Sequence, residues 1–365
     1  MPTLCTFVFV NSRKTILVAP LHWGLGHATR CIPIVRALLA TDYNVLLASD
    51  GGALLLLRKE FPKLSYVTLP SYNITYPKKG AFLKLKLILK APYIQKIVAS
   101  EKKVIEKLVA EEKIHGIISD NRWGVRSEKV PSVLITHQLN VLSGSTSYIS
   151  SKMHQNLIKK FDACWVPDLE GSINLSGMLG HFKNLLAAPF PVTYIGLLSR
   201  MQKKKVPIVY DILCLLSGPE PQRTTLEKKL LSVFKNSEKD ILIVQGLVED
   251  EKKEHQIGNI RVVNFLQSVA LEQAINESEC VISRSGYTTL MDLAAMEKKA
   301  FFIPTPGQFE QEYLAKQLKK AGIVPSCKQN EFEENKLNEI DLFKGLNDFN
   351  SKPDFKKLFR FFERE

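Results

Sequence analysis

The sequence predicts an α/β protein made of two doubly wound domains, and three observations lead to that prediction. Short apolar runs typical of buried strands alternate with longer segments whose apolar residues recur at helix spacing. The alternation continues on both sides of a polar, basic stretch near residue 200. The length of 365 residues is long for one hydrophobic core and fits two domains.

Composition narrows the class of protein and of partner. Hydrophobic residues make up 45% and charged residues 24%, as in globular proteins. Six cysteines are scattered without a CxxC pair, which predicts reduced core thiols in a cytoplasmic protein. No apolar run approaches the roughly 18 residues of a membrane span. A net charge of +13 indicates an anionic partner, either a nucleotide substrate or a membrane surface; no nucleic-acid-binding motif is present.

The first element is a strand over residues 15–19, followed by a glycine turn and an apolar helix. Gly24 and Gly26 permit a tight turn, and His27 stands at the start of the helix. A helix N-terminus lowers the pKa of a histidine and favours its neutral form, which can act as a base. His27 is therefore a candidate base, and the alternative is a capping or packing histidine.

Polar clusters follow two later strands. Residues 115–119 read as a strand that ends at Asp120 and Asn121, and residues 132–136 as one that ends at a segment containing His137 and Asn140. Polar residues just past the ends of adjacent parallel strands line the crevice where ligands bind. We expect Asp120, Asn121, His137 and Asn140 to line that crevice, with loop capping as the alternative for each.

Residues 78–107 form a basic segment. Six lysines and no acid interleave with apolar residues over 78–96, and a helix is expected to kink or restart at Pro92. Such a mixture is typical of a surface that attracts anionic lipid. A core helix with solvated lysines is the alternative.

The best domain boundary is the polar and basic stretch 199–207. It divides an N-terminal domain, 1–198, from a C-terminal domain, 208–345, and we expect the remaining 346–365 to form an amphipathic C-terminal helix. The second domain opens with a strand that ends at Ser217 and Gly218.

The chain is organised around residues 279–322, which read as strand, glycine turn, helix, strand, loop and helix. Free backbone N–H groups at the N-terminus of the first helix would make a phosphate site, and Gly286 would let the ligand approach the backbone. Thr288 and Thr289 would add hydroxyl donors, and the carboxylate of Asp292, one turn later, could hold a ribose. The alternative is an ordinary α/β packing unit.

This stretch resembles the donor-binding segment of MurG-type glycosyltransferases. Their pattern reads roughly R-[SA]-G-A-x-T-x-x-E, then a strand ending in proline, then a loop with Gln-Gln. The matching residues here are Arg284, Ser285, Gly286, Thr289, Asp292, Pro304, Gln311 and Glu312. The resemblance implies that Asp292 holds the ribose and Gln311 contacts the sugar. Asp in place of Glu, and Glu312 in place of the second Gln, leave the donor sugar open.

Other segments share the resemblance. The strand, glycine turn and His27 resemble the first glycine loop of GT-B glycosyltransferases. Ser217 and Gly218 match a loop that faces the diphosphate, and Phe265 and Leu266 match a position where the backbone meets uracil. The resemblance implies a GT-B fold of two Rossmann-like domains facing a cleft, with the last helix crossing back to the first domain.

The implied activity is inverting, metal-independent transfer of a sugar from a UDP-sugar to a hydroxyl acceptor, either lipid-linked or free, with no cofactor. The residues expected on the acceptor side are Gly24, Gly26, Asn121, His137 and Asn140. His27 or Asp120 would be the base. The enzyme would be cytoplasmic and peripheral on the inner face of the membrane. A nucleotide-sugar epimerase or hydrolase of the same fold, or a non-catalytic nucleotide-sugar-binding protein, remains the alternative.

Overall fold

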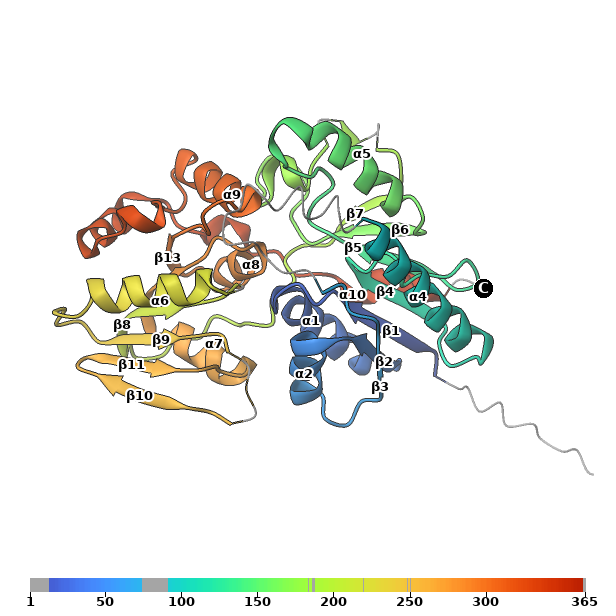
Figure 1. The fold of residues 1–365 in the computed structure, drawn as a ribbon, viewed down its shortest axis with the longest axis horizontal. Helices are drawn as coiled ribbons and strands as arrows, with labels where there is room; N and C mark the ends of the chain where they lie inside the picture. The colour runs from blue at the N-terminus through green and yellow to red at the C-terminus, as the bar shows by residue number, and fades with distance from the viewer. Residues whose placement is uncertain are drawn as a thin grey trace, which may run out of the picture.

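The computed structural model describes residues 13–73, 91–182, 184–185, 188–218, 220–247, 249 and 251–363. The chain forms two parallel-sheet α/β domains, one on each side of the interface where helices α1 (Gly26–Ala40) and α8 (Tyr287–Ala295) meet (Figure 1). The predicted fold class is therefore confirmed.

The first sheet has the strand order β3-β2-β1-β4-β5-β6-β7, with parallel neighbours. The order reverses between β1 and β4, where doubly wound folds open a crevice at the carboxyl ends of the strands. The strands are β1 (Thr15–Pro20), β2 (Asn44–Ser49), β3 (Tyr66–Thr68), β4 (Gly116–Asp120), β5 (Ser132–Ile135), β6 (Ala163–Val166) and β7 (Val192–Tyr194). With α1, the helices of this domain are α2 (Gly51–Glu60), α4 (Ala91–Ala110) and α5 (Ser147–Ile158).

The second sheet has the order β10-β11-β9-β8-β12-β13. Its pairs are parallel except at one edge, where β10 and β11 form an antiparallel hairpin that the sequence analysis did not predict. The strands are β8 (Tyr210–Leu215), β9 (Ile241–Val244), β10 (Glu254–Ile257), β11 (Ile260–Val263), β12 (Ser278–Ser283) and β13 (Lys299–Phe302). With α8, the helices are α6 (Gln222–Val233), α7 (Ser268–Asn276) and α9 (Phe309–Lys320).

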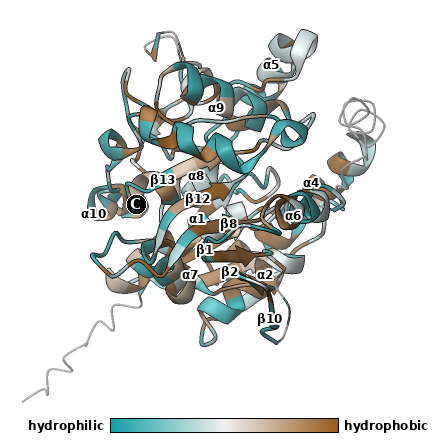
Figure 2. Ribbon diagram, turned by 90° about the vertical axis from the view of Figure 1, so that its left-hand side faces the viewer, coloured by the Kyte–Doolittle hydropathy of each residue, from teal (hydrophilic) through white to brown (hydrophobic). Residues whose placement is uncertain are grey.

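Burial explains why these segments form these elements. Strand β4 is buried along its whole length, and β1 along all but its first residue, because both lie at the centre of a sheet with helices on its two faces. Figure 2 shows apolar strands β1, β2 and β8 inside helices that are polar on the outside. Helix α9 ends before Gly322, whose φ of +67° is the left-handed conformation that glycine supplies at helix ends.

The C-terminal segment crosses back to the first domain, as predicted. Tyr43 Oη donates to the Phe359 carbonyl at 3.3 Å, and Lys14 Nζ donates to the Phe362 carbonyl at 3.0 Å. A continuous helix over 346–365 is wrong, because residues 350–354 are not helical, and Pro353, which lacks a backbone N–H, lies in that break. The segment contains α10 (Phe355–Phe359) between the 3₁₀ turns η7 (Asn347–Phe349) and η8 (Arg360–Phe362). The other 3₁₀ turns are η2 (Gly144–Thr146), η3 (Gly177–Leu179), η5 (Gln329–Glu331) and η6 (Glu334–Leu342).

Three further expectations concern the chain as a whole. The segment 199–207 joins β7 to β8, and the division into domains at that place stays a prediction. The described cysteines are free thiols, four of them buried, while Cys5 lies outside the described residues. Residues 78–90 of the basic segment also lie outside them, and α4 begins at Ala91, next to Pro92. No helix in the described part of the chain is long and apolar enough to span a bilayer.

Candidate active site

The candidate site lies where the N-termini of α1 and α8 meet. The side chain of Thr288 donates to the Gly26 carbonyl at 3.1 Å, which joins the first turns of the two helices. A Cβ on Gly26 would stand 2.9 Å from Thr288 Oγ1, so a larger residue there would displace the Thr288 hydroxyl. Pro20 pairs with Asp120 in the sheet register, which brings the carboxyl ends of β1 and β4 to the same place. The predicted glycine turn and the predicted donor helix therefore face each other.

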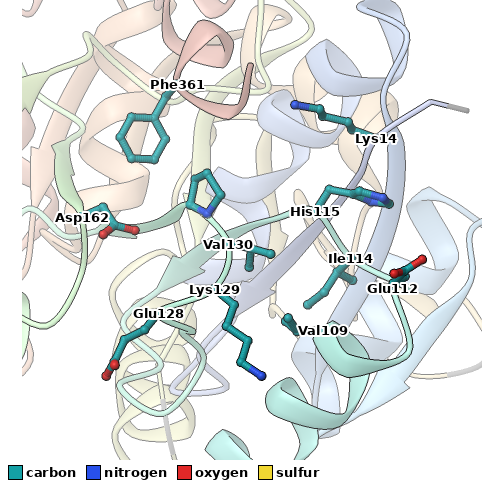
Figure 3. Close-up of a pocket in the computed structure, with 11 residues that line it drawn as sticks. Lys14, Val109, Glu112, Ile114, His115, Glu128, Lys129, Val130, Asp162 and Phe361 are labelled. Carbon is teal, nitrogen blue, oxygen red and sulfur yellow. The ribbon is translucent and has the colours of Figure 1, made fainter. Parts of the chain in front are cut away.

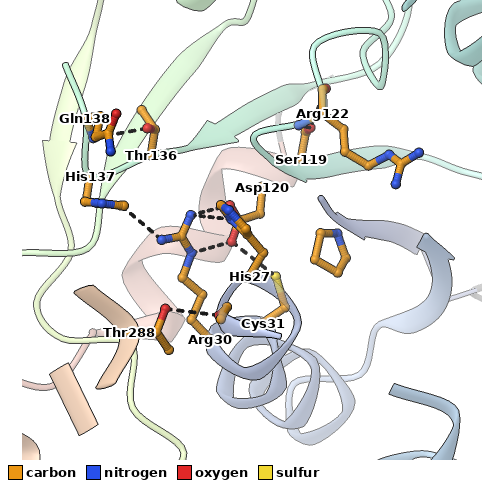
Figure 4. Close-up of polar contacts among 12 residues, drawn as sticks. His27, Arg30, Cys31, Ser119, Asp120, Arg122, Thr136, His137, Gln138 and Thr288 are labelled. Carbon is orange, nitrogen blue, oxygen red and sulfur yellow. Dashed lines mark hydrogen bonds and ion pairs between the residues drawn. The ribbon is translucent and has the colours of Figure 1, made fainter. Parts of the chain in front are cut away.

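His27 and Asp120 form a hydrogen-bonded pair at this junction (Figure 4). His27 Nδ1 lies 2.7 Å from Asp120 Oδ1. Although burial would raise it, Arg30 and His27 hold the pKa of Asp120 down, to about 2. The carboxylate therefore holds no proton at neutral pH. His27 Nδ1 also lies 2.9 Å from Arg30 Nη2, but its contact with Asp120 is shorter, so we assign the Nδ1 hydrogen to the bond with the carboxylate. The lone pair of the imidazole is then on Nε2, which is the form a general base requires.

Burial lowers the pKa of His27 below its ordinary value, an effect that Asp120 opposes and Arg30 adds to. The ring is therefore neutral at physiological pH and ready to accept a proton. The two predicted candidates for the base are not independent, because Asp120 is fully buried and lies behind His27. Its position is that of a carboxylate that orients the imidazole and stabilises the imidazolium once it forms.

Arg30 completes this cluster and was missed by the sequence analysis. Its guanidinium donates to both carboxylate oxygens of Asp120 in a bidentate pair, and its side chain is 1% exposed. Arg30 also donates to His137 Nδ1 at 3.1 Å. One signal was available in the sequence: a charged residue interrupts the apolar face of α1 three positions after His27.

A second buried cluster supports the loop that follows β4. Arg122 donates to Asp50 at 2.6 Å and to Glu101 at 2.8 Å, with its own side chain fully buried. Glu101 also accepts from the Gly124 N–H at 3.0 Å. These bonds fix the loop that carries Asn121, whose positive φ of 57° marks a tight turn.

His137 is part of the junction, and its partner comes from the other domain. His137 Nε2 lies 2.9 Å from Glu310 Oε1, and Gln138 Nε2 donates to Glu310 Oε2 at 2.5 Å. The His137 ring stacks on Tyr287, with centroids 4.2 Å apart and planes 4° apart. Tyr287 Oη in turn donates to the Pro167 carbonyl at 2.9 Å. Neither Glu310 nor Tyr287 was singled out from the sequence.

The donor segment keeps its predicted local arrangement. Gly286 is the N-cap of α8, with an extended backbone, and a Cβ placed on it would have only Gln311 Nε2 nearby, at 3.9 Å. Ser285 Oγ donates to the Gln311 carbonyl at 2.8 Å, and Gln311 Oε1 accepts from the Thr305 N–H at 2.8 Å. Ser285, Gly286 and Gln311 therefore lie together, with open space in front of the glycine. Thr289 lies half-buried in the same first turn.

Arg284 and Glu312 make other contacts. Arg284 is buried, and it donates to the carbonyls of Ile303, Pro304 and Gln222. These bonds tie β13 to the start of α6, and burial lowers the pKa of Arg284 to about 10. Glu312 is exposed and accepts from the Gly307 N–H at 2.8 Å, which caps the preceding loop. Both residues support the backbone around the site in this structure.

Asp292 is 7% exposed and accepts from Ser199 Oγ at 2.6 Å. Burial raises its pKa above the ordinary value, and Arg200 and Ser199 oppose this effect. The carboxylate of the donor helix is thus joined to the segment that connects the two sheets. From the sequence, Asp292 was expected to hold a ribose and 199–207 to separate the domains, and this bond was not predicted.

The remaining candidates lie around the junction. Ser217 and Gly218 follow β8, and the φ of +99° at Gly218 requires glycine. Phe265 and Leu266 follow β11, and Lys59 of α2 lies 5.1 Å from the centre of the Phe265 ring. On the acceptor side, Gly24 has a φ of +86°.

Asn140 matches the loop-capping alternative. Its Nδ2 donates to the carbonyls of Met178, at 2.8 Å, and His181, at 3.1 Å.

A pocket of about 680 Å³ opens at the other edge of the first sheet (Figure 3). Its lining includes Lys14, His115, Pro131 and Asp162, which immediately precede β1, β4, β5 and β6. The pocket is therefore at the amino ends of the strands, away from the helix N-termini that attract phosphate. It does not compete with the junction as a nucleotide site.

Comparison with known proteins supports the resemblance. The family described as glycosyltransferase family 28 C-terminal domain matches residues 220–354. A UDP-N-acetylglucosamine-N-acetylmuramyl-(pentapeptide) pyrophosphoryl-undecaprenol N-acetylglucosamine transferase of Histophilus somni is 23% identical over 345 residues, 91% of this chain and 89% of the relative. An uncharacterized glycosyltransferase of Methanosarcina mazei is 22% identical over 323 residues, 82% of each chain.

Solved structures agree on the fold. MurG of Acinetobacter baumannii superposes with a TM-score of 0.55 at 16% identity, covering 97% of this chain and all of the other. A UDP-glucosyltransferase of Polygonum tinctorium gives a TM-score of 0.61 at 12% identity, covering 97% and 99%. The chain is a MurG-like GT-B glycosyltransferase. This glycosyltransferase uses a nucleotide-sugar donor, and the matched family segment contains α8 and α9.

Proposed function

We propose that the enzyme transfers a sugar from a UDP-sugar to a hydroxyl acceptor by an inverting mechanism that requires no metal ion. One observation carries the proposal: the His27–Asp120 pair lies at the N-terminus of α1, which the Thr288–Gly26 bond holds against the N-terminus of α8. A base and a phosphate-binding helix end are thus adjacent. The names of the relatives describe transfer from UDP-N-acetylglucosamine to an undecaprenol-linked acceptor, which favours UDP and a lipid-linked acceptor here.

The donor would bind to the second domain. Its diphosphate would meet the free N–H groups at the start of α8, where the open space in front of Gly286 leaves room for it. Thr288 and Thr289 would add donors, and Ser217 and Gly218 would lie opposite. The uracil would contact the backbone at Phe265 and Leu266, Asp292 would hold the ribose, and Gln311 would contact the sugar, as the resemblance implies.

The reaction follows from the state of His27. The acceptor hydroxyl would give its proton to His27 Nε2 while its oxygen attacks the anomeric carbon. The bond from that carbon to the diphosphate oxygen breaks, UDP leaves, and one displacement inverts the configuration. Asp120 stabilises the imidazolium, and the positive end of α8 stabilises the charge on the leaving diphosphate.

The acceptor would enter from the first domain, and the membrane would supply it if it is lipid-linked. In α4, the described part of the basic segment exposes Lys96, Lys103 and Lys107. Basic side chains near a surface attract anionic lipid. We propose that this helix faces an anionic membrane, and flotation with liposomes that contain anionic lipid tests the proposal. Failure to float would remove it.

A UDP-release assay tests the activity. The enzyme is incubated with a panel of UDP-sugars, with and without a membrane lipid extract. Release that depends on the extract supports transfer to a lipid-linked acceptor. Release without any acceptor would indicate a hydrolase, consumption of donor without release would indicate an epimerase, and binding of UDP without turnover would indicate a binding protein.

A further inference from the structure

The first turn of α9 reaches across to the end of β5 in the other domain. Its Glu310 accepts from Gln138 Nε2 at 2.5 Å and lies 2.9 Å from His137 Nε2. Although burial would raise it, His137 and, more weakly, His27 and Arg30 hold the pKa of Glu310 below its ordinary value. Glu310 is therefore a carboxylate at neutral pH, placed among groups that attract it.

His137 connects Glu310 to the cluster that contains the base. A guanidinium can only donate, so the Arg30 bond of 3.1 Å makes His137 Nδ1 an acceptor. Nε2 must then carry a hydrogen, which it donates to Glu310. Glu310 thus fixes both the tautomer and the tilt of His137, because a bond at each nitrogen leaves the ring no freedom to flip.

Arg30 continues the chain of bonds. Its guanidinium binds both oxygens of Asp120, and Asp120 Oδ1 accepts from His27 Nδ1 at 2.7 Å. A continuous path therefore runs from Glu310 of the donor domain to the imidazole in the other domain. Each of its inner members is at least nine-tenths buried, so water does not easily replace a missing partner.

We propose that Glu310 is a positioning residue that latches the donor domain onto the His27–Asp120 pair and orients the base when the cleft is closed. The inference rests on the proposed function for its catalytic part. The claim that Glu310 holds the two domains together rests on the contacts alone. Separation of the two domains would break the bond between Glu310 and His137. The base would therefore be held in its working orientation only while the donor domain is in place.

Two variants and a control test the latch. Glu310→Ala removes the acceptor for His137 and Gln138. Glu310→Gln keeps an amide oxygen for His137, and Gln138 can turn its own amide to match. Glu279→Ala is the matched control, because it removes an exposed acid near the amino end of β12, away from the site.

Closure is measured first, without reference to catalysis. Small-angle X-ray scattering of the ligand-free protein should show a larger radius of gyration for Glu310→Ala than for the wild type. Glu310→Gln and Glu279→Ala should match the wild type. A Glu310→Ala protein as compact as the wild type would overturn the latch, whether or not a substrate has been found.

Turnover is measured second, with the donor that the UDP-release assay identifies. Glu310→Ala should lower kcat about 10- to 100-fold, as displaced catalytic groups do. Its affinity for UDP, which lacks the sugar, should not change. Glu310→Gln should retain kcat within about threefold of the wild type. An unchanged kcat in Glu310→Ala, or a loss in Glu310→Gln as large as in Glu310→Ala, would overturn the positioning role.

A double-mutant cycle covers the case in which Glu310→Ala folds poorly. His137→Phe keeps a ring to stack on Tyr287 and removes both hydrogen bonds. Glu310→Ser, whose side chain is too short to reach His137, should lower kcat on its own. If Glu310 acts through His137, then Glu310→Ser should make no further difference to kcat in the His137→Phe background. Additive losses would show two independent roles and would overturn the chain of bonds.

Discussion

The hydroxyl of Thr288 donates to the carbonyl of Gly26, 262 residues away along the chain, across a distance of 3.1 Å. This bond joins the helix proposed to bind the diphosphate to the helix that carries the base. Both helices present their N-termini at the contact, so a region of positive potential lies beside a neutral histidine. A diphosphate bound there would place the bond to be broken close to His27.

Gly286→Ala should separate folding from donor binding. The backbone of Gly286 has a φ of −71°, which alanine adopts without strain, and the new Cβ would have only Gln311 Nε2 near it, at 3.9 Å. The free energy of unfolding should change by no more than about 0.5 kcal/mol. The methyl group would occupy the place where the diphosphate approaches, so UDP affinity should fall about tenfold or more. Denaturant unfolding and calorimetric titration with UDP check the two values.

Gly322→Ala provides the opposite control for that experiment. Its φ of +67° is strained for alanine, so the variant should lose about 1 kcal/mol of stability and keep its UDP affinity. Unchanged UDP affinity in Gly286→Ala would count against the donor site at α8.

His27→Ala should lower kcat about 10²- to 10⁴-fold, the usual contribution of a positioned base. UDP affinity should stay the same, because the proposed donor contacts come from the second domain. Steady-state kinetics and UDP titration measure the two effects. The exposed His255 of β10 gives a matched control, since His255→Ala removes an imidazole far from the junction. Normal turnover in His27→Ala would exclude His27 as the base.

Arg30→Ala should destabilise the fold by about 3–5 kcal/mol, because it leaves the buried charge of Asp120 without its bidentate partner. Urea unfolding at neutral pH measures the loss. Arg36→Ala, which breaks a 3.3 Å ion pair from a 45% exposed side chain on the same helix, should cost less than about 1 kcal/mol. Equal losses in the two variants would contradict a special role for the buried pair.

Acid should destabilise the protein below pH 6.5. Burial lowers the pKa of His154 to about 4, and burial also lowers the pKa of His27. Between about pH 4 and 6.5 the unfolded chain binds protons at these histidines and the folded chain does not, so the free energy of unfolding falls with pH. For His154 the full effect is about 3 kcal/mol.

Urea unfolding at several pH values measures how the free energy of unfolding depends on pH. Asp120 adds its own loss at lower pH, since its stabilising effect disappears as pH falls from about 4 through its folded pKa of about 2. His154→Gln should flatten the curve between pH 6.5 and 4. A curve that stays as steep as in the wild type would place the titrating group elsewhere.

Asp292→Ala should weaken UDP binding about 10- to 100-fold if its carboxylate holds the ribose, since bonds to a charged group are the stronger kind. Asp292→Asn should lose less, because the amide still accepts one bond. Titration with UDP measures both. Asp341→Ala, which removes a 76% exposed acid paired with Lys299, is the control. Equal UDP affinity in all four proteins would remove Asp292 from the donor site.

Much of the fold was accessible from the sequence. The strand at residues 15–19 and the end of the helix at residue 322 were predicted within one or two residues. Such elements follow from the apolar period and from the residues that end a helix, which are local signals. The hairpin edge formed by β10 was not predicted, because its residues are exposed and polar and show no apolar alternation.

The candidate site was accessible only in part. The His27, Asp120 and Gly286 positions were selected because each follows a predicted strand, and the structure brings them to one junction. Arg30 was missed because an arginine in a helix is ordinarily solvated. Nothing in the sequence shows that it will be buried and paired with a carboxylate 90 residues later. Asn140 and Arg284 hold backbone carbonyls, a distinction that residue type alone does not make.

The sequence by itself determined the alternation of strands and helices, the glycine turns and the residue types at the strand ends, because each depends on neighbours a few positions away. Only the tertiary structure decided which of those residues meet. Glu310 and His137 are 173 residues apart and belong to different domains, so no periodicity relates them. Their contact exists because two sheets bring their carboxyl edges together, and that placement is set by packing over the whole interface.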